Sequence, residues 1–138
     1  MVDSLRAIPL FAELSARDLK HLAASMTERT YEPGQVVVTQ GTGGVGFFVI
    51  LDGRAKVSQD GEDRGTLEAG DYFGEMALID GNDRAASVHA EGQLRCAAMT
   101  AWNFRPFVRE NPDVAWALLN ALAKRVRESQ ARLTPAAG

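Results

Sequence analysis

The chain has 138 residues, of which 46% are hydrophobic and 24% charged, and its 15 lysines and arginines against 18 aspartates and glutamates give a net charge of −3 at pH 7. This length favours a single domain with its own hydrophobic core, built without a metal or disulfides. The acidic balance and the lack of a basic run exclude a general attraction to nucleic acid or anionic membranes, so neither is an expected partner.

Two short helices are predicted at the N-terminus. Apolar residues recur at helical spacing between Leu5 and Met26, with a break at Pro9. The pattern restarts at Ser15, a residue type that caps helix N-termini, with Asp18 three positions later. We therefore expect one helix before Pro9 and another after Ser15.

The region from Thr27 to about Thr100 has the pattern of an antiparallel β-structure. Short runs rich in valine, phenylalanine, isoleucine and threonine alternate with glycine-containing turns about every 8 to 12 residues. This spacing predicts a β-sandwich or barrel.

Two further helices are predicted at the C-terminal end, Trp102–Glu110 and Asp113 to about Leu133, with a break at Asn111 and Pro112. The expected fold is mainly β with flanking α: an antiparallel β-roll or jelly-roll barrel with N-terminal helices, a short helix within the β region and two C-terminal helices. Residues 1–133 are expected to form one domain, and residues 134–138 a C-terminal tail.

One segment inside the β region predicts an anion-binding site. A strand is expected to end at Phe73, Gly74 allows a sharp turn, and 75–79 can form one helical turn whose free N–H groups suit an anion. Arg84 lies 84 − 75 = 9 positions after Glu75, at the expected start of the next strand, where its guanidinium can return over this turn. One arginine balances about one negative charge.

A carboxylate close to an anion would be repelled by it. The presence of Glu75 is explained if its carboxylate accepts hydrogen bonds from a ribose hydroxyl of the same ligand. A ribose next to a singly charged phosphate describes a 3′,5′-cyclic nucleotide. Charge alone does not fix that identity, because a glutamate and an arginine nine positions apart occur by chance in most proteins.

The stretch FGEMALIDGNDRAASV, Phe73–Val88, resembles the phosphate-binding cassette of cyclic-nucleotide-binding domains, as in protein kinase A regulatory subunits, cyclic-nucleotide-gated channels and the catabolite activator protein. Upstream, Gln40–Gly53 is similar to the glycine-punctuated hairpin of that family, with Tyr31–Val38 before it, and Pro9–Ser15 resembles its helical lead-in. The resemblance runs from about Leu5 to Arg127.

The resemblance implies roles for particular residues. Gly74 and the N–H groups of the cassette turn would contact the cyclic phosphate, Glu75 the ribose 2′-hydroxyl, and Arg84 the exocyclic phosphate oxygens. The remaining candidate ligand-binding residues are Leu67 and Met76 for the apolar wall around the base, Ala77 in the cassette turn, and Ala85 and Ala86 for backbone N–H contacts. No catalytic or metal-binding residue is expected.

The ligand expected from this resemblance is cAMP, with cGMP bound more weakly. Cyclic-GMP-preferring relatives usually have threonine after the cassette arginine, and this chain has Ala85. Arg125 aligns with a base-contacting arginine of several channel domains, and its guanidinium could stack on the base. The alternative is a solvated helix end, because Lys124 and Arg127 also lie where cations suit the helix dipole.

The last helix also carries an apolar stripe of heptad-like spacing, formed by Leu119, Leu122, Val126 and Leu133. It packs either against the roll, as a lid, or against a second copy of the chain in a homodimer. Nearer the site, Asp83 could pair with Arg84 before a ligand arrives.

Three functions remain open. The favoured one is a cyclic nucleotide sensor that acts on an unidentified effector protein or domain through reorientation of its C-terminal helix. The second is a non-catalytic scaffold or interaction domain whose pocket is empty or holds another small anion. The third, a metal-assisted enzyme, lacks the necessary cluster, because His21 and His89 are isolated. The charged N-terminus is unlike a secretion signal, the single Cys96 is expected to be buried as a thiol, and a cytoplasmic location is expected.

Overall fold

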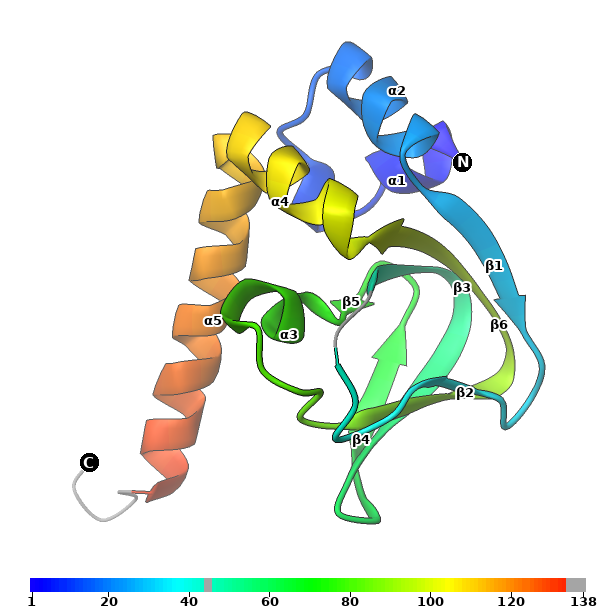
Figure 1. The fold of residues 1–138 in the computed structure, drawn as a ribbon, viewed down its shortest axis with the longest axis vertical. Helices are drawn as coiled ribbons and strands as arrows, with labels where there is room; N and C mark the ends of the chain where they lie inside the picture. Colours follow the sequence, from blue (N-terminus) through cyan, green and yellow to red (C-terminus); the bar gives the residue numbers. More distant parts are fainter. Residues whose placement is uncertain (44–45, 134–138) are drawn as a thin grey trace.

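The computed structural model describes residues 1–43 and 46–133, with helices at both ends of the chain around a central curved β-structure (Figure 1). Gly44, which belongs to the predicted glycine-rich hairpin, and the predicted tail 134–138 lie outside the described residues, as does the side chain of Leu133.

The N-terminal region forms α1 (Val2–Arg6), the 3₁₀ helix η1 (Pro9–Phe11) and α2 (Ala16–Ala24). The break at Pro9 and the cap at Ser15 are confirmed: the Ser15 hydroxyl accepts a hydrogen bond from the Asp18 N–H at 3.1 Å. The 3₁₀ turn is an addition to the prediction. It begins at Pro9, whose fixed φ suits the first position of a helical turn and which has no N–H to leave unpaired there.

The strands pair antiparallel throughout. The two longest, β3 (Gly46–Gln59) and β6 (Ser87–Thr100), pair with each other along most of their length. The shorter β1 (Thr27–Tyr31) and β2 (Val36–Val38) pair with β6, and β4 (Glu62–Glu68) and β5 (Tyr72–Phe73) pair with β3. The predicted fold class, a mainly antiparallel β-roll with flanking helices, is confirmed.

The long strand β3 is irregular around Gly53. The pairing register between β3 and β6 shifts on both sides of the preceding residue, Asp52, and the φ of Gly53 is +90°. A Cβ at this position would collide with the carbonyl oxygen of Gln93 on the neighbouring strand. Only glycine permits both the left-handed backbone and the close approach.

The remaining helices are α3 (Glu75–Asp80), α4 (Ala101–Glu110) and α5 (Pro112–Leu133), close to the predicted ranges. The expectation that the strand after α3 begins at Arg84 is wrong, because β6 begins at Ser87. The backbone of Arg84 bonds instead to the turn before β3: its N–H donates to Thr42 O, and its carbonyl accepts from the N–H of Gly41. Arg84 therefore lies in a loop that is hydrogen-bonded to the turn between β2 and β3.

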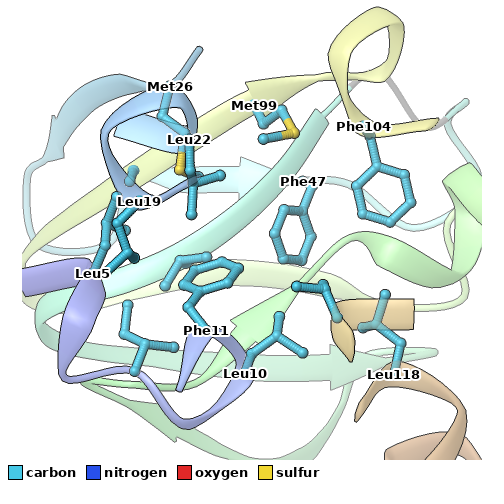
Figure 2. Close-up of a cluster of buried hydrophobic side chains, with 14 residues drawn as sticks. Leu5, Leu10, Phe11, Leu19, Leu22, Met26, Phe47, Met99, Phe104 and Leu118 are labelled. Atoms are coloured by element: carbon cyan, nitrogen blue, oxygen red, sulfur yellow. The ribbon is translucent and has the colours of Figure 1, made fainter. Parts of the chain in front are cut away.

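Neighbouring residues of β3 contribute side chains to two separate apolar cores, because side chains alternate between the faces of a strand. Phe47 belongs to a cluster between the sheet and the helices, where its ring faces Phe104 of α4 with centroids 5.2 Å apart (Figure 2). Phe48 belongs to a cluster inside the roll, where it stacks on Phe73 at 5.1 Å. The cassette that follows Phe73 is thus anchored to the interior of the roll.

The helix α5 packs on the rest of the protein through Val114 and Leu118, which are 2% and 3% exposed. The interpretation of the apolar stripe as a lid against the roll is wrong for Leu119 and Val126, which are 56% and 55% exposed. The helical phase that buries Val114 and Leu118 turns these two residues to solvent, and Leu122 is half-buried. None of the helices in the described residues is long and apolar enough to cross a membrane.

Candidate ligand-binding site

The cassette turn is built around Gly74, which connects β5 to α3 with a left-handed backbone of φ +95°. A Cβ at this position would lie 2.6 Å from the carbonyl oxygen of Gly46 and 2.7 Å from Nη1 of Arg84. Both distances are shorter than the van der Waals contact distance of a carbon atom with oxygen or nitrogen. Glycine is therefore required here for its conformation and for the space that it leaves.

Arg84 is a buried cation that is held by backbone carbonyl groups. Its Nη1 donates to Gly74 O at 3.1 Å and its Nη2 to Gly46 O at 2.8 Å, and the residue is only 6% exposed. Burial lowers the pKa of Arg84, and the nearby Glu75 carboxylate opposes this effect. Two of the five guanidinium N–H groups are used in this way, which leaves three to donate to an anion.

The expected pairing of Asp83 with Arg84 is not among the ion pairs of the described residues. Asp83 instead lies in a backbone bridge with Gly43. Two N–H groups of the Arg84 guanidinium are held by carbonyl groups, and none of the ion pairs of the described residues includes Arg84.

Glu75 opens α3 and is the second buried charged residue of the site, at 4% exposure. Burial raises the pKa of its carboxyl group, and the positive charge of Arg125 is the strongest of the opposing influences, ahead of the N–H groups of the turn and Arg84. Its Oε1 lies 3.7 Å from Nη1 of Arg125, whereas Oε2 is buried with no hydrogen-bond partner among the described residues. Such an acceptor is costly unless a ligand donates to it.

Arg125 brings α5 to the site. Besides Glu75, its Nη1 contacts the sulfur of Met76 at 3.3 Å, and its own side chain is 54% exposed. The C-terminal helix thus touches two consecutive residues of the cassette helix through one guanidinium.

An open pocket of about 150 Å³ joins these groups. It is lined by all nine residues that the sequence singled out: Leu67, Gly74, Glu75, Met76, Ala77, Arg84, Ala85, Ala86 and Arg125. The sequence therefore located the residues that come together, although their separate roles toward a ligand stay predictions.

Sequence reasoning missed five further lining residues: Val38, Val57, Tyr72, Phe73 and Val88. Three of them form a row across neighbouring strands, because Val88 of β6 pairs with Val38 of β2 and with Val57 of β3. The strand sequences do not single out these three valines, because β2 consists of three consecutive valines, and only the register brings the row together. Tyr72 and Phe73 were visible as the residues directly before Gly74.

The arrangement fits a ligand with three properties. A cationic end, made by Arg84 and the turn at Gly74, suits a small anion. The free Oε2 of Glu75 requires a hydroxyl or N–H donor, and the valine row suits an apolar or aromatic group. These three features face one cavity, so one molecule can use them together.

Comparison with known proteins agrees with this geometry. The cyclic nucleotide-binding domain family matches residues 28–111. A cAMP-dependent protein kinase regulatory subunit of Mycosarcoma maydis is 44% identical over 92 residues, which cover 64% of this chain and 18% of that protein. A cyclic nucleotide-gated potassium channel of Rhizobium etli is 32% identical over 109 residues, which cover 79% of this chain and 30% of that protein. The chain thus spans less than a third of the length of these curated relatives.

Solved structures show the same fold. The catabolite activator protein of Thermus thermophilus superposes with a TM-score of 0.84 at 28% identity, over 94% of this chain and 63% of that one. The structure described as cAMP-bound PfPKA-R has a TM-score of 0.83 at 23% identity, over 96% of this chain and 45% of that one. The fold, the cassette and the family match over more than half of the sequence lead to one conclusion: the chain belongs to the cyclic nucleotide-binding domain family.

Proposed function

We propose that this chain is a regulatory module, residues 1–133, that binds cAMP and passes on its occupancy through the C-terminal helix. The observation that carries the proposal is the pair of buried charges in one pocket: Arg84, with N–H groups to spare, and Glu75, with an unsatisfied oxygen. Binding, without catalysis, is the proposed activity.

The cyclic phosphate is assigned to the guanidinium of Arg84 and to the N–H groups of the cassette turn at Gly74 and Ala77. The ribose 2′-hydroxyl is assigned to Oε2 of Glu75, which has no other donor among the described residues. A 3′,5′-cyclic phosphate carries one negative charge, which matches the single buried arginine. Adenine would then lie against Leu67, Met76 and the valine row.

Cyclic AMP is proposed in preference to cGMP, which should bind more weakly. Two observations support this choice. The regulatory subunits that match the chain are named for cAMP dependence, and Ala85 offers no hydroxyl to the amino group of guanine. The N–H groups of Ala85 and Ala86 are proposed to add contacts to the phosphate.

The output is proposed to run through α5 to an effector protein or domain. Arg125 supports this step, since it is the point where α5 reaches the pocket. A ligand that binds better when α5 lies against the cassette shifts the population of α5 positions by its difference in affinity. The effector would read that shift.

A homodimer through α5 is a second proposal, supported by apolar residues that this helix leaves exposed. Trp116 is 67% exposed, and Leu119 and Val126 follow at 3 and 10 positions, the spacing of a coiled-coil seam. Sedimentation equilibrium tests it: a dimer that dissociates on Leu119→Glu supports the seam, and a monomer at every concentration contradicts it.

Calorimetric titration with cAMP and cGMP tests the proposed ligand. We expect saturable binding of both, with cAMP tighter, and loss of cAMP binding in Arg84→Lys, which keeps the charge but not the forked geometry. Arg54→Lys, a change at an exposed arginine outside the pocket, is the matched control and should bind as the wild type does.

A wild-type protein that gives no heat with either nucleotide, and co-purifies with none by mass spectrometry, contradicts the proposal. That result would favour the scaffold function with an empty pocket. Binding of inorganic phosphate but not of cAMP would favour a different small anion.

A further inference from the structure

The two oxygens of the Glu75 carboxylate have different surroundings. Oε1 lies 3.7 Å from Nη1 of Arg125, while Oε2 is buried and has no partner in the described part of the chain. Arg125 comes from α5, which lies beside α3 in Figure 1 although the two residues are 125 − 75 = 50 positions apart. One carboxylate therefore faces the pocket and the C-terminal helix at the same time.

The two partners of this ion pair are buried very unequally. The Glu75 side chain is 5% exposed, and that of Arg125 is 54% exposed. Removal of Arg125 would leave the buried carboxylate without its nearest counter-charge from α5, whereas the arginine gives up little when it turns to water. The pair thus affects Glu75 more than Arg125.

The charge of Arg125 changes what Glu75 can do. Burial raises the pKa of Glu75, and the Arg125 guanidinium, which lies 3.7 Å from Oε1, is the strongest of the groups that oppose this shift, so it favours the ionised form. An ionised carboxylate accepts shorter and stronger hydrogen bonds from a hydroxyl than a neutral carboxyl does. The hydrogen bond that Oε2 accepts is therefore strengthened by Arg125, although the arginine contacts only Oε1.

We propose that Arg125 is a positioning residue that acts through Glu75: it orients the carboxylate so that Oε2 accepts the sugar hydroxyl of the ligand, and the occupied carboxylate in turn holds α5 against α3. This inference rests on the proposed function, in which that donor is the ribose 2′-hydroxyl. The coupling is reciprocal, because any gain in ligand affinity from the ion pair is an equal gain in the ion pair from the ligand.

The alternative is that the Arg125 guanidinium stacks on the base, and the two roles predict different results. Stacking depends on the base and not on the 2′-hydroxyl. An effect through Glu75 depends on the 2′-hydroxyl and not on the base.

A thermodynamic cycle separates them. The affinities of cAMP and 2′-deoxy-cAMP are measured by calorimetry for the wild type and for Arg125→Gln. We expect Arg125→Gln to weaken cAMP about tenfold, the value of a hydrogen bond to a charged group, and 2′-deoxy-cAMP less than about twofold. Arg125→Lys, which keeps the charge, should restore part of the loss for cAMP. Equal losses for the two nucleotides overturn the inference.

The matched control is Arg127→Gln, because Arg127 is an exposed arginine on the same helix outside the pocket. It should change neither affinity. Arg125 is itself half-exposed, so its variants should remain folded, which a thermal melt checks.

Hydrogen exchange of the α5 amides gives a second readout. In the wild type, saturating cAMP should slow exchange in α5 more than saturating 2′-deoxy-cAMP does, and Arg125→Gln should abolish the difference. Equal protection by the two nucleotides in the wild type contradicts the coupling. A wild type that binds no cAMP defeats the proposed function itself, whereas normal cAMP binding with equal losses defeats this inference alone.

Discussion

The hydrogen bond from Arg84 to Gly74 exists because Gly74 has no side chain. Nη1 of Arg84 donates to Gly74 O at 3.1 Å, and a Cβ on Gly74 would lie 2.7 Å from the same nitrogen. The glycine thus provides both the acceptor and the space for the guanidinium. Its role is to bring a cation against the N-terminus of α3.

Substitution of Gly74 by alanine should therefore damage both stability and binding. The methyl group must adopt a left-handed backbone and displace either the Arg84 guanidinium or Gly46 O, which would be only 2.6 Å away. We expect the free energy of unfolding to fall by about 2–4 kcal/mol and the affinity for cAMP to fall at least about tenfold. Urea unfolding and calorimetry measure the two effects.

Gly81 offers a matched control for this substitution. It has a similar left-handed backbone, φ +75°, but a Cβ there would meet nothing within 4 Å. Gly81→Ala should cost about 1 kcal/mol of stability from backbone strain and leave cAMP affinity unchanged. Equal losses of affinity in both variants would show that the close approach to Arg84 is not the cause.

Titration of Glu75 should make the ligand-free protein less stable as the pH rises. The pKa of Glu75 is raised above its usual 4.5 in the folded chain, chiefly by burial. Between 4.5 and that higher value the folded state binds more protons than the unfolded state, so the free energy of unfolding falls with increasing pH across this window.

The variant Glu75→Gln isolates this contribution, because glutamine keeps the shape and does not titrate. Urea unfolding of both proteins from pH 4 to pH 8 should show stability moving in favour of Glu75→Gln as the pH rises. A constant difference between the two curves would mean that Glu75 has no raised pKa. Other carboxyl groups, such as Asp63 with its lowered pKa, cancel in the comparison.

The boundaries of the helices, but not of the individual strands, could be predicted from local signals. Ser15 caps α2 through its own hydroxyl, Pro9 interrupts the first helices, and Asn111 separates α4 from α5. The start of β6 could not, because Arg84 and its neighbours bond to residues about 40 positions earlier in the sequence. Local pattern carries no information on such a partner.

The candidate site was also predictable only in part from the sequence. Glu75 and Arg84 were recognisable because the stretch that contains them, FGEMALIDGNDRAASV, resembles the phosphate-binding cassette of cyclic-nucleotide-binding domains. The row of Val38, Val57 and Val88 was not, since it depends on the register of three strands. The interpretation of the stripe containing Leu119 as a lid contact was wrong for a related reason: apolar residues lie on more than one face of α5, and contacts with the core select the face that buries Leu118.

Cys96 should be inert to thiol reagents in the folded protein. Its side chain is fully buried inside the roll, and burial raises its pKa to about 12. At pH 8 roughly one thiol in ten thousand would then be ionised. Labelling with a chromogenic disulfide reagent should be slow in buffer, fast in urea, and slower still with cAMP. Rapid labelling of the native protein would contradict the buried position.

The side chain at position 85 is expected to affect the choice between adenine and guanine. Ala85 is exposed at the edge of the pocket, so a larger residue fits without repacking. Ala85→Thr should improve cGMP relative to cAMP by about fivefold, the value of one hydrogen bond, because its hydroxyl can accept from the amino group of guanine. Ala85→Val has nearly the same shape and no hydroxyl, so its ratio of the two affinities should remain that of the wild type. If valine shifts the ratio as much as threonine does, shape at residue 85 and not hydrogen bonding selects the nucleotide.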